Sequence, residues 1–60
     1  LYMSQKILDR IEEYEHGELS FERTVLLFQD LVDTGMIWKV DTNLCEEAYK
    51  LIERGYVLQR

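Results

Sequence analysis

Apolar residues recur every three or four positions in three stretches of the chain, and each stretch ends at a glycine. This spacing places apolar side chains on one face of an α-helix. A glycine directly after such a stretch is a common helix stop, because glycine adopts the left-handed conformation without steric cost. The pattern therefore predicts a mainly α protein with three helices, which end at Gly17, Gly35 and Gly55.

The first predicted helix spans about residues 4–16, with Ser4 as its candidate N-cap. Its apolar stripe occupies one side, and acidic residues with Arg10 fill the other. The stripe comprises Met3, Ile7, Leu8, Ile11 and Tyr14. We therefore expect one side of this helix to cover the core.

The second predicted helix follows Ser20 and ends near residue 34. The Ser20 hydroxyl can accept a hydrogen bond from an amide of the first turn, and Leu19 is placed to pack on that turn. The apolar stripe comprises Phe21, Val25, Phe28, Leu31 and Val32, and Thr24, Leu26 and Leu27 widen it. A helix that is apolar over so much of its circumference contacts neighbours on two sides. This helix is therefore expected at the centre of the fold.

The third predicted helix starts at residues 41–43, where three capping-type residues are adjacent, and ends before Gly55. Asn43 and Glu46 have the spacing of a capping box, in which each side chain bonds the other's backbone amide. The predicted inner face consists of Leu44, Ala48, Leu51 and Ile52, with Cys45 and Tyr49 beside it.

The last third of the chain contains one pattern twice, LVDTGMIWKV at residues 31–40 and LIERGYVLQR at residues 51–60. After each glycine comes a short run rich in β-branched and aromatic residues, at 36–40 and 56–59. Two strands that pair with each other would satisfy their exposed backbone groups, which gives a two-stranded ribbon in a small, winged-helix-like domain. The alternative is that both runs are irregular segments lying against the helices.

The chain of 60 residues is expected to form a single domain, residues 1–60, with a thin core. One cysteine cannot form an internal disulfide, and one cysteine with one histidine cannot complete a four-ligand zinc site. We therefore expect no metal and no cofactor. Self-association, with a dimer favoured, is the expected reinforcement of so small a core.

Seven basic and twelve acidic residues give a net charge of −5, which disfavours binding to phosphate backbones and to anionic membranes. No apolar run approaches the roughly 20 residues of a membrane span, and no segment resembles a signal peptide. We expect a soluble, intracellular protein. Met3, preceded by Leu1 and Tyr2, is a candidate natural start.

The candidate reactive residues all have simpler interpretations. His16 lies at the end of the first predicted helix, where a cation favours the helix dipole, and Cys45 suits a small, half-buried position. The carboxylate pairs lie on predicted solvent faces, whereas acid–base catalysis needs carboxyl groups in contrasting environments. These pairs are Glu12 with Glu13, Asp30 with Asp33, and Glu46 with Glu47. We expect no enzyme activity.

Aromatic and apolar residues of the two post-glycine runs are the candidate contacts for a partner or a second copy. In the ribbon, one face would carry Met36, Trp38 and Val40, and the facing strand would carry Tyr56 and Leu58. Trp38 either fills the core or lies in an interface, where tryptophan often dominates the binding energy. The candidate interaction residues are Met36, Ile37, Trp38, Val40, Tyr56 and Leu58. Replacing Trp38 by alanine is expected to weaken assembly or binding more than any charge reversal on the first helix.

Three blocks of the chain resemble a family of very small uncharacterised proteins of tailed bacteriophages. The blocks read YExGELS, FQxLxDTGxxW and LIExGY, at residues 14–20, 28–38 and 51–56. The chain departs from that family at residues 40–45, where similar proteins have a Gln-Gly-x-Tyr-Gly-Arg segment. The resemblance implies a viral origin and no established activity.

Together these features favour a non-catalytic phage accessory protein that binds and inhibits a host macromolecule in the bacterial cytoplasm, as an anti-defence or anti-CRISPR inhibitor would. Direct nucleic-acid binding is disfavoured by the charge. One alternative is a helix-turn-helix-like DNA-binding regulator. Another is an oligomer that sequesters a signalling nucleotide through Arg23, Lys39, Arg54 and Arg60.

Overall fold

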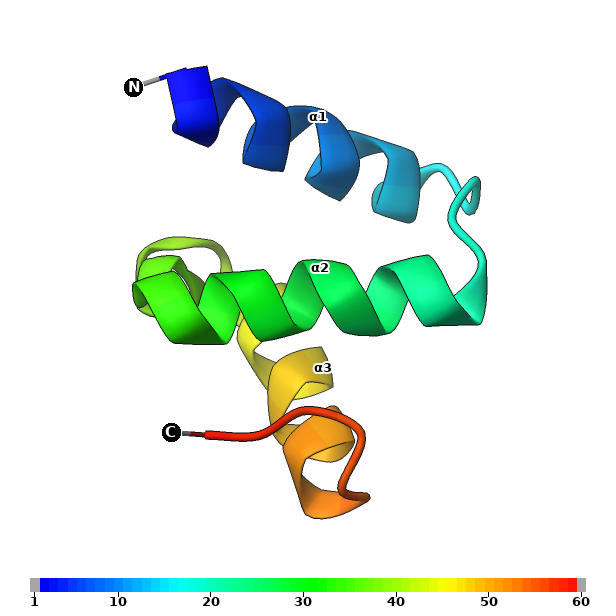
Figure 1. Cartoon of the computed structure of the whole chain (residues 1–60), viewed down its shortest axis with the longest axis vertical. Helices are drawn as coiled ribbons and strands as arrows, with labels where there is room; N and C mark the ends of the chain where they lie inside the picture. Colours follow the sequence, from blue (N-terminus) through cyan, green and yellow to red (C-terminus); the bar gives the residue numbers. More distant parts are fainter. Residues whose placement is uncertain (1, 60) are drawn as a thin grey trace.

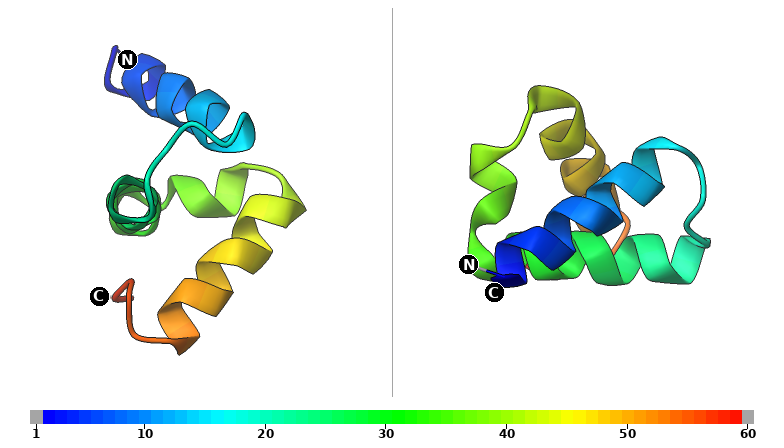
Figure 2. Two further views of the ribbon diagram at one scale, coloured as in Figure 1. Left: turned by 90° about the vertical axis from the view of Figure 1, so that its right-hand side faces the viewer. Right: turned by 90° about the horizontal axis from the view of Figure 1, so that it is seen from above.

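The protein folds into three α-helices and one short 3-10 helix, seen in a computed structural model that describes residues 2–59, with the side chains of the first helix described from Lys6 onward. In chain order the elements are α1 (Tyr2–Glu15), α2 (Phe21–Thr34), η1 (Met36–Lys39) and α3 (Thr42–Glu53). Helices α1 and α3 lie on opposite sides of α2 (Figures 1 and 2). The predicted mainly α, three-helix architecture is confirmed.

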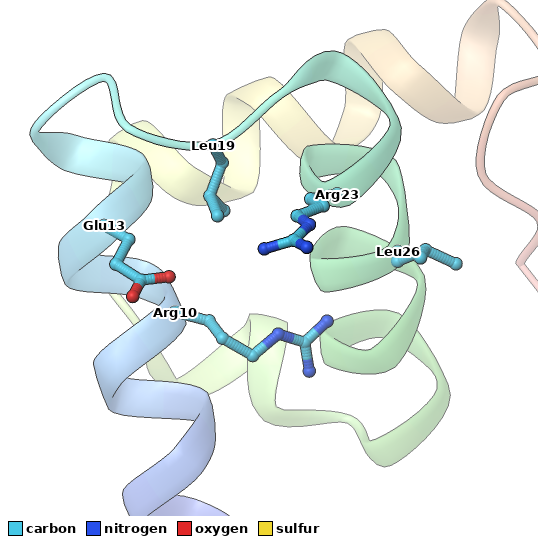
Figure 3. A pocket seen from close by; sticks show the side chains of 5 residues that line it. All are labelled: Arg10, Glu13, Leu19, Arg23 and Leu26. Atoms are coloured by element: carbon cyan, nitrogen blue, oxygen red, sulfur yellow. The ribbon is translucent and has the colours of Figure 1, made fainter.

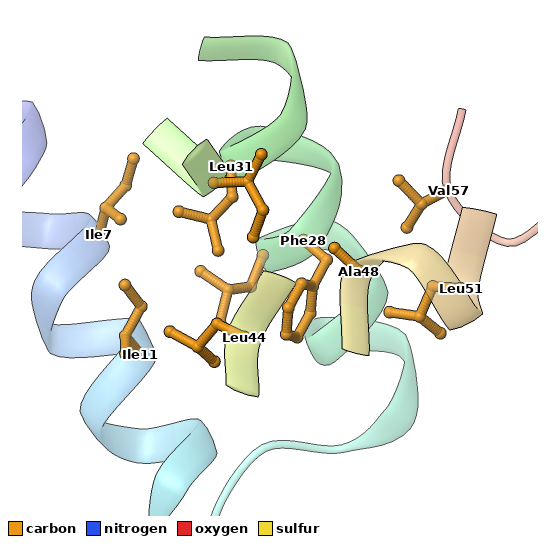
Figure 4. Packing of buried hydrophobic residues seen from close by; sticks show 10 residues of the cluster. Ile7, Ile11, Phe28, Leu31, Leu44, Ala48, Leu51 and Val57 are labelled. Atoms are coloured by element: carbon orange, nitrogen blue, oxygen red, sulfur yellow. The ribbon is translucent and has the colours of Figure 1, made fainter. Parts of the chain in front are cut away.

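The core lies along α2, which packs against α1, η1 and α3. Leu27, Phe28 and Leu31 of α2 are completely buried at its centre. Around them pack residues from every other element, as Figure 4 shows for most of the cluster. These are Ile7 and Ile11 of α1, Ile37 of η1, Leu44, Ala48 and Leu51 of α3, and Val57 near the C-terminus. The central place of the second helix is thus confirmed.

Three apolar residues of the predicted stripes are not core residues: Leu8, Phe21 and Leu26 are exposed. Phe21 at the start of α2 and Leu26 near its middle lie on a side of the helix that α1 and α3 leave uncovered. Met3 belongs to the side chains outside the described part of the structure.

The helix starts are partly as predicted. Ser20 caps α2, since its Oγ accepts from the Arg23 N–H at 3.2 Å. The Asn43–Glu46 capping box is wrong: Asp41 is the N-cap of α3, and its Oδ1 accepts from the Leu44 N–H at 3.2 Å. The helix starts at Thr42, whereas a helix capped by Asn43 would start two residues later, directly after its cap.

Ser4 is not an N-cap, because α1 already begins at Tyr2 and Ser4 lies inside its first turn. The three predicted glycine stops are confirmed, each with a positive φ. After α3 the Tyr56 N–H donates to Leu51 O at 2.9 Å and the Gly55 N–H to Ile52 O at 3.0 Å. This pair of bonds is the Schellman motif, which satisfies the last carbonyls of a helix.

The predicted two-stranded ribbon is wrong. Residues 36–39 form η1, residues 56–59 are irregular, and no strand occurs between residues 2 and 59. Each run finds its hydrogen-bond partners elsewhere: the Trp38 N–H donates to Gly35 O at 3.2 Å, and Leu58 bonds to a side chain of α2. Because their backbone groups are satisfied in this way, neither run needs the other as a partner. The irregular-segment alternative therefore holds for residues 56–59 but not for residues 36–39, which form a 3-10 helix, and the winged-helix comparison does not hold.

A candidate binding surface on α2 and the C-terminal segment

The exposed side of α2 forms a shallow apolar groove together with Tyr56, the first residue after Gly55. Its lining residues are Phe21, Glu22, Val25, Leu26 and Tyr56, and its volume is about 430 Å³. Leu26 has an exposed fraction of 60%, the largest among the apolar residues of the groove. We call this surface the apolar groove.

A ring contact closes one side of the apolar groove. The rings of Phe21 and Tyr56 lie 5.0 Å apart, edge to face at 84°. This geometry is favourable because the positive edge of one ring faces the negative face of the other. Both side chains nevertheless remain about half exposed, so each still offers apolar area to a partner.

A second, polar pocket opens between α1 and α2 on the other side of Leu26. It has a volume of about 280 Å³, and its lining includes Arg10, Glu13 and Arg23 (Figure 3), with Leu19 and Leu26. Arg10 Nη1 pairs with Asp30 Oδ2 at 2.8 Å. Two guanidinium groups therefore face two carboxylates around this pocket, which leaves no excess of positive charge for a phosphate.

The predicted nucleotide-binding cations are not brought together. Arg23 lies on α2, Lys39 on η1 and Arg54 directly after α3, and Arg23 alone of these lines the polar pocket. Arg60 lies outside the described residues. On α3 the exposed Lys50 stands among exposed carboxylates, so this helix carries no basic face for DNA either.

The six predicted interaction residues divide by exposure. Ile37 has an exposed fraction of 0% and is a core residue, so its side chain is not available to a partner in this structure. Met36 and Val40 are half-buried against the core. The three exposed members are Trp38, Tyr56 and Leu58.

Trp38 does not fill the core, because half of its surface, 50%, is exposed. Its ring lies 5.7 Å from the ring of Tyr49 on α3, tilted by 51°. Trp38 thus belongs to a different aromatic pair from Tyr56, which contacts Phe21. The predicted common face for these two aromatic residues does not exist, because it required paired strands.

Sequence reasoning missed Phe21 and Leu26 as surface residues, since both were assigned to the buried stripe of the second helix, whereas Val25 of that stripe does pack on the core. A signal was present in the width of that stripe. Three short helices cannot cover every side of a central helix that is apolar around most of its circumference. Part of such a helix must then remain at the surface.

The potentially reactive groups are scattered. Cys45 is half-buried, as expected, and its Sγ donates to Ile37 O at 2.9 Å. Burial raises the pKa of the Tyr14 phenol, and the carboxylates of Glu47 and Glu15 raise it further. Within the described residues, no group of three or more His, Cys, Asp or Glu side chains is arranged to hold a metal ion.

The helices of the described part of the chain are too short or too polar to cross a membrane.

A family model for a domain of unknown function, DUF7417, matches residues 3–60. The chain belongs to the DUF7417 family. Neither a curated protein nor a solved structure matches the chain. The description of DUF7417 states no activity.

Proposed function

We propose that this member of DUF7417 is a non-catalytic phage accessory protein that binds and inhibits a host protein in the bacterial cytoplasm. The observation that carries the proposal is the apolar groove, where Phe21, Leu26 and Tyr56 are all at least half exposed. Exposed apolar side chains gathered around a groove mark interaction surfaces. The phage-like sequence blocks supply the viral part of the proposal.

The charge of the chain indicates what kind of host protein would fit. Glu22 is the charged residue among the five that line the apolar groove, and the whole chain has a net charge of −5. A partner with an apolar anchor beside basic side chains would be complementary in both respects, and opposite charges also speed the encounter. Nucleases and other defence proteins that hold nucleic acid expose such basic surfaces.

Self-association through the same groove is the competing occupant, and the predicted dimer stays a prediction. Two copies would each bring a charge of −5, and this repulsion opposes their association. We therefore propose a host protein, and not a second copy of the chain, as the occupant of the apolar groove.

The test compares two exposed leucines on different helices. The variant Leu26→Glu alters the apolar groove, and the matched control Leu8→Glu places the same charge on α1. Both variants should unfold at nearly the urea concentration of the unaltered protein, because neither leucine is in the core. A host protein captured from bacterial lysate and then purified should bind Leu26→Glu at least about tenfold more weakly than Leu8→Glu, a difference of about 1.4 kcal/mol.

Equal affinities for the two variants would exclude the apolar groove as the binding surface. A third variant, Trp38→Ala, examines the other aromatic pair: a larger loss of affinity there than for Leu26→Glu would move the binding surface to η1 and α3. Sedimentation of the unaltered protein at micromolar concentration tests whether a second copy of the chain occupies the groove. A dimer that dissociates in Leu26→Glu would show that the occupant of the groove is a second copy.

A further inference from the structure

The irregular C-terminal segment, residues 56–59, is bonded to α2 through the side chain of Gln29. Gln29 Oε1 accepts from the Leu58 N–H at 2.8 Å, and Gln29 Nε2 donates to Leu58 O at 2.8 Å. A residue facing Leu58 in an antiparallel strand would make the same two bonds with its own backbone. The side-chain amide of Gln29 thus substitutes for one residue of a strand.

A neighbouring carboxylate on α2 fixes which way this amide points. Gln29 Nε2 also donates to Asp33 Oδ1 at 2.9 Å. A carboxylate accepts hydrogen bonds and does not donate them, so the NH₂ end of the amide must face Asp33. The oxygen end is then left to face the Leu58 N–H, which is the arrangement that the bonds to Leu58 require.

The rest of the segment depends on two further attachments. The Val57 side chain is buried in the core near Leu51 and Ala48 (Figure 4), and the Val57 N–H donates to Leu51 O at 3.3 Å. Beyond Val57 the chain runs back alongside α2 (Figures 1 and 2). Tyr56, on the other side of Val57, is thereby held with its ring against Phe21.

We propose that Gln29 is a positioning residue for the binding surface: its amide holds Leu58 on α2, and this holds Tyr56 in place as a wall of the apolar groove. Tyr56 and Leu58 flank Val57, and both are about half exposed, so burial alone fixes neither of them. Without the amide, Val57 remains as an anchor about which the segment can turn. The structural part of this inference stands alone, and its consequence for binding rests on the proposed function.

The first test replaces Gln29 by methionine, which keeps an unbranched side chain of similar length and removes both bonds to Leu58. The decisive measurement is the contact between the Phe21 and Tyr56 rings, followed by NMR cross-relaxation. We expect this contact to be lost, and amide exchange at Leu58 to become about fivefold faster, the change for losing about one net hydrogen bond. Exchange at Phe28 in the core should change by a smaller factor.

Two results would overturn the proposal. Retention of the ring contact in Gln29→Met would show that the amide does not position Tyr56. An equal acceleration of exchange at Leu58 and Phe28 would show that Gln29 merely stabilises the whole fold.

A second variant removes the same interaction from the other side. A chain of 60 residues can be made by chemical synthesis, with an ester in place of the amide of Leu58. The ester deletes the N–H that donates to Gln29 Oε1 and leaves every side chain unchanged. An ester at Leu19 is the control, because among the described residues neither the Leu19 N–H nor the Glu18 carbonyl before it has a protein partner. The Leu58 ester should weaken the ring contact and the Leu19 ester should not. Combined with Gln29→Met, the Leu58 ester should add little, because two changes that remove one interaction are not additive. Full additivity would contradict the proposal.

The binding measurement separates this inference from the proposed function. If Gln29→Met loses the ring contact and binds the purified host protein at least about tenfold more weakly, both are supported. If it loses the ring contact but neither it nor Leu26→Glu alters binding, the positioning role stands and the proposed function fails. If the ring contact is retained, the positioning role fails whatever the binding shows.

Discussion

Residues 31–40 and residues 51–60 are two copies of one local pattern, and the structure uses their first halves in the same way. Leu31 and Leu51 are buried, and the glycine four positions later ends the helix with φ of 79° in one copy and 81° in the other. Two residues beyond the glycine, Ile37 and Val57 are both core residues. The next residue is exposed in each copy, Trp38 in one and Leu58 in the other.

The second halves differ. In the first copy the chain turns into η1 and reaches Asp41, the cap of α3, and the Cys45 thiol bonds to the Ile37 carbonyl. In the second copy the segment lies along α2 and is held by Gln29. The comparison teaches that a helix stop and the buried residue after it are local properties. The path beyond them depends on which side chains the rest of the fold places nearby.

The largest expected effect comes from the buried residue of each copy. Ile37→Ala should destabilise the protein by about 2–5 kcal/mol, and Val57→Ala by about 2 kcal/mol because fewer buried carbons are removed. Urea unfolding followed by circular dichroism measures both, with Lys39→Ala in the first copy and Leu58→Ala in the second as exposed controls that should each cost less than about 1 kcal/mol. Should Ile37→Ala leave no folded protein, Ile37→Val should still cost about 0.5–1.5 kcal/mol. If the exposed controls lost as much stability as the core variants, the buried residue after each glycine would not be the position that stabilises the fold.

The two glycines should respond equally to substitution. Alanine at Gly35 or Gly55 is expected to cost about 1–2 kcal/mol, because a Cβ disfavours a positive φ. An added Cβ would meet no atom within 4 Å at either position, so backbone strain alone should set the cost. Thermal or urea unfolding of both variants gives the comparison. A difference above about 1 kcal/mol would mean that one glycine does more than end a helix.

The aromatic pairs are expected to show a smaller difference. Phe21→Ala removes the ring beside Tyr56, and Tyr49→Ala removes the ring beside Trp38. Each ring pair should contribute about 0.5–1.5 kcal/mol beyond its buried area, and the closer edge-to-face pair should contribute more. Double-mutant cycles with Tyr56→Ala and Trp38→Ala measure the two coupling energies. A larger value for the Trp38 pair would reverse the expected order.

The smallest effect concerns the thiol bond of the first copy. Cys45→Ala deletes the donor to Ile37 O and should cost below about 1 kcal/mol, whereas Cys45→Ser retains a donor and should cost less. Urea unfolding and amide exchange in residues 36–39 report the loss. No change in either measurement would show that the path of the first copy is determined by the connection to α3 alone.

The helices could be predicted because their signals are short-range. Apolar spacing, a Ser20 hydroxyl near the amides of its own first turn, and a glycine that accepts a positive φ all act within about one helical turn. The same locality explains the errors at the other two starts. Three adjacent capping residues before α3 fit several starting points, and in the structure it is Asp41 that caps the helix.

The candidate surface could not be predicted because it depends on what remains uncovered. An exposed Leu26 and a buried Leu27 are neighbours in the same apolar run, and the positions of α1 and α3 decide which of them is exposed. The alternation of Met36, Trp38 and Val40 suggested a strand. A strand, however, needs a partner at the right distance, and here Cys45 in the following helix and the sequence-distant Gln29 bond to the backbone instead.

The amino-acid sequence by itself determined three helices, their glycine ends and the small size of the core, because these follow from interactions between residues within a turn of each other. Tertiary structure alone decided that the post-glycine runs stay apart, that Ile37 rather than Trp38 is buried, and that Gln29 receives the C-terminal segment. Those outcomes depend on contacts across 20 residues or more, or on competition for a limited buried volume, and no local pattern encodes either.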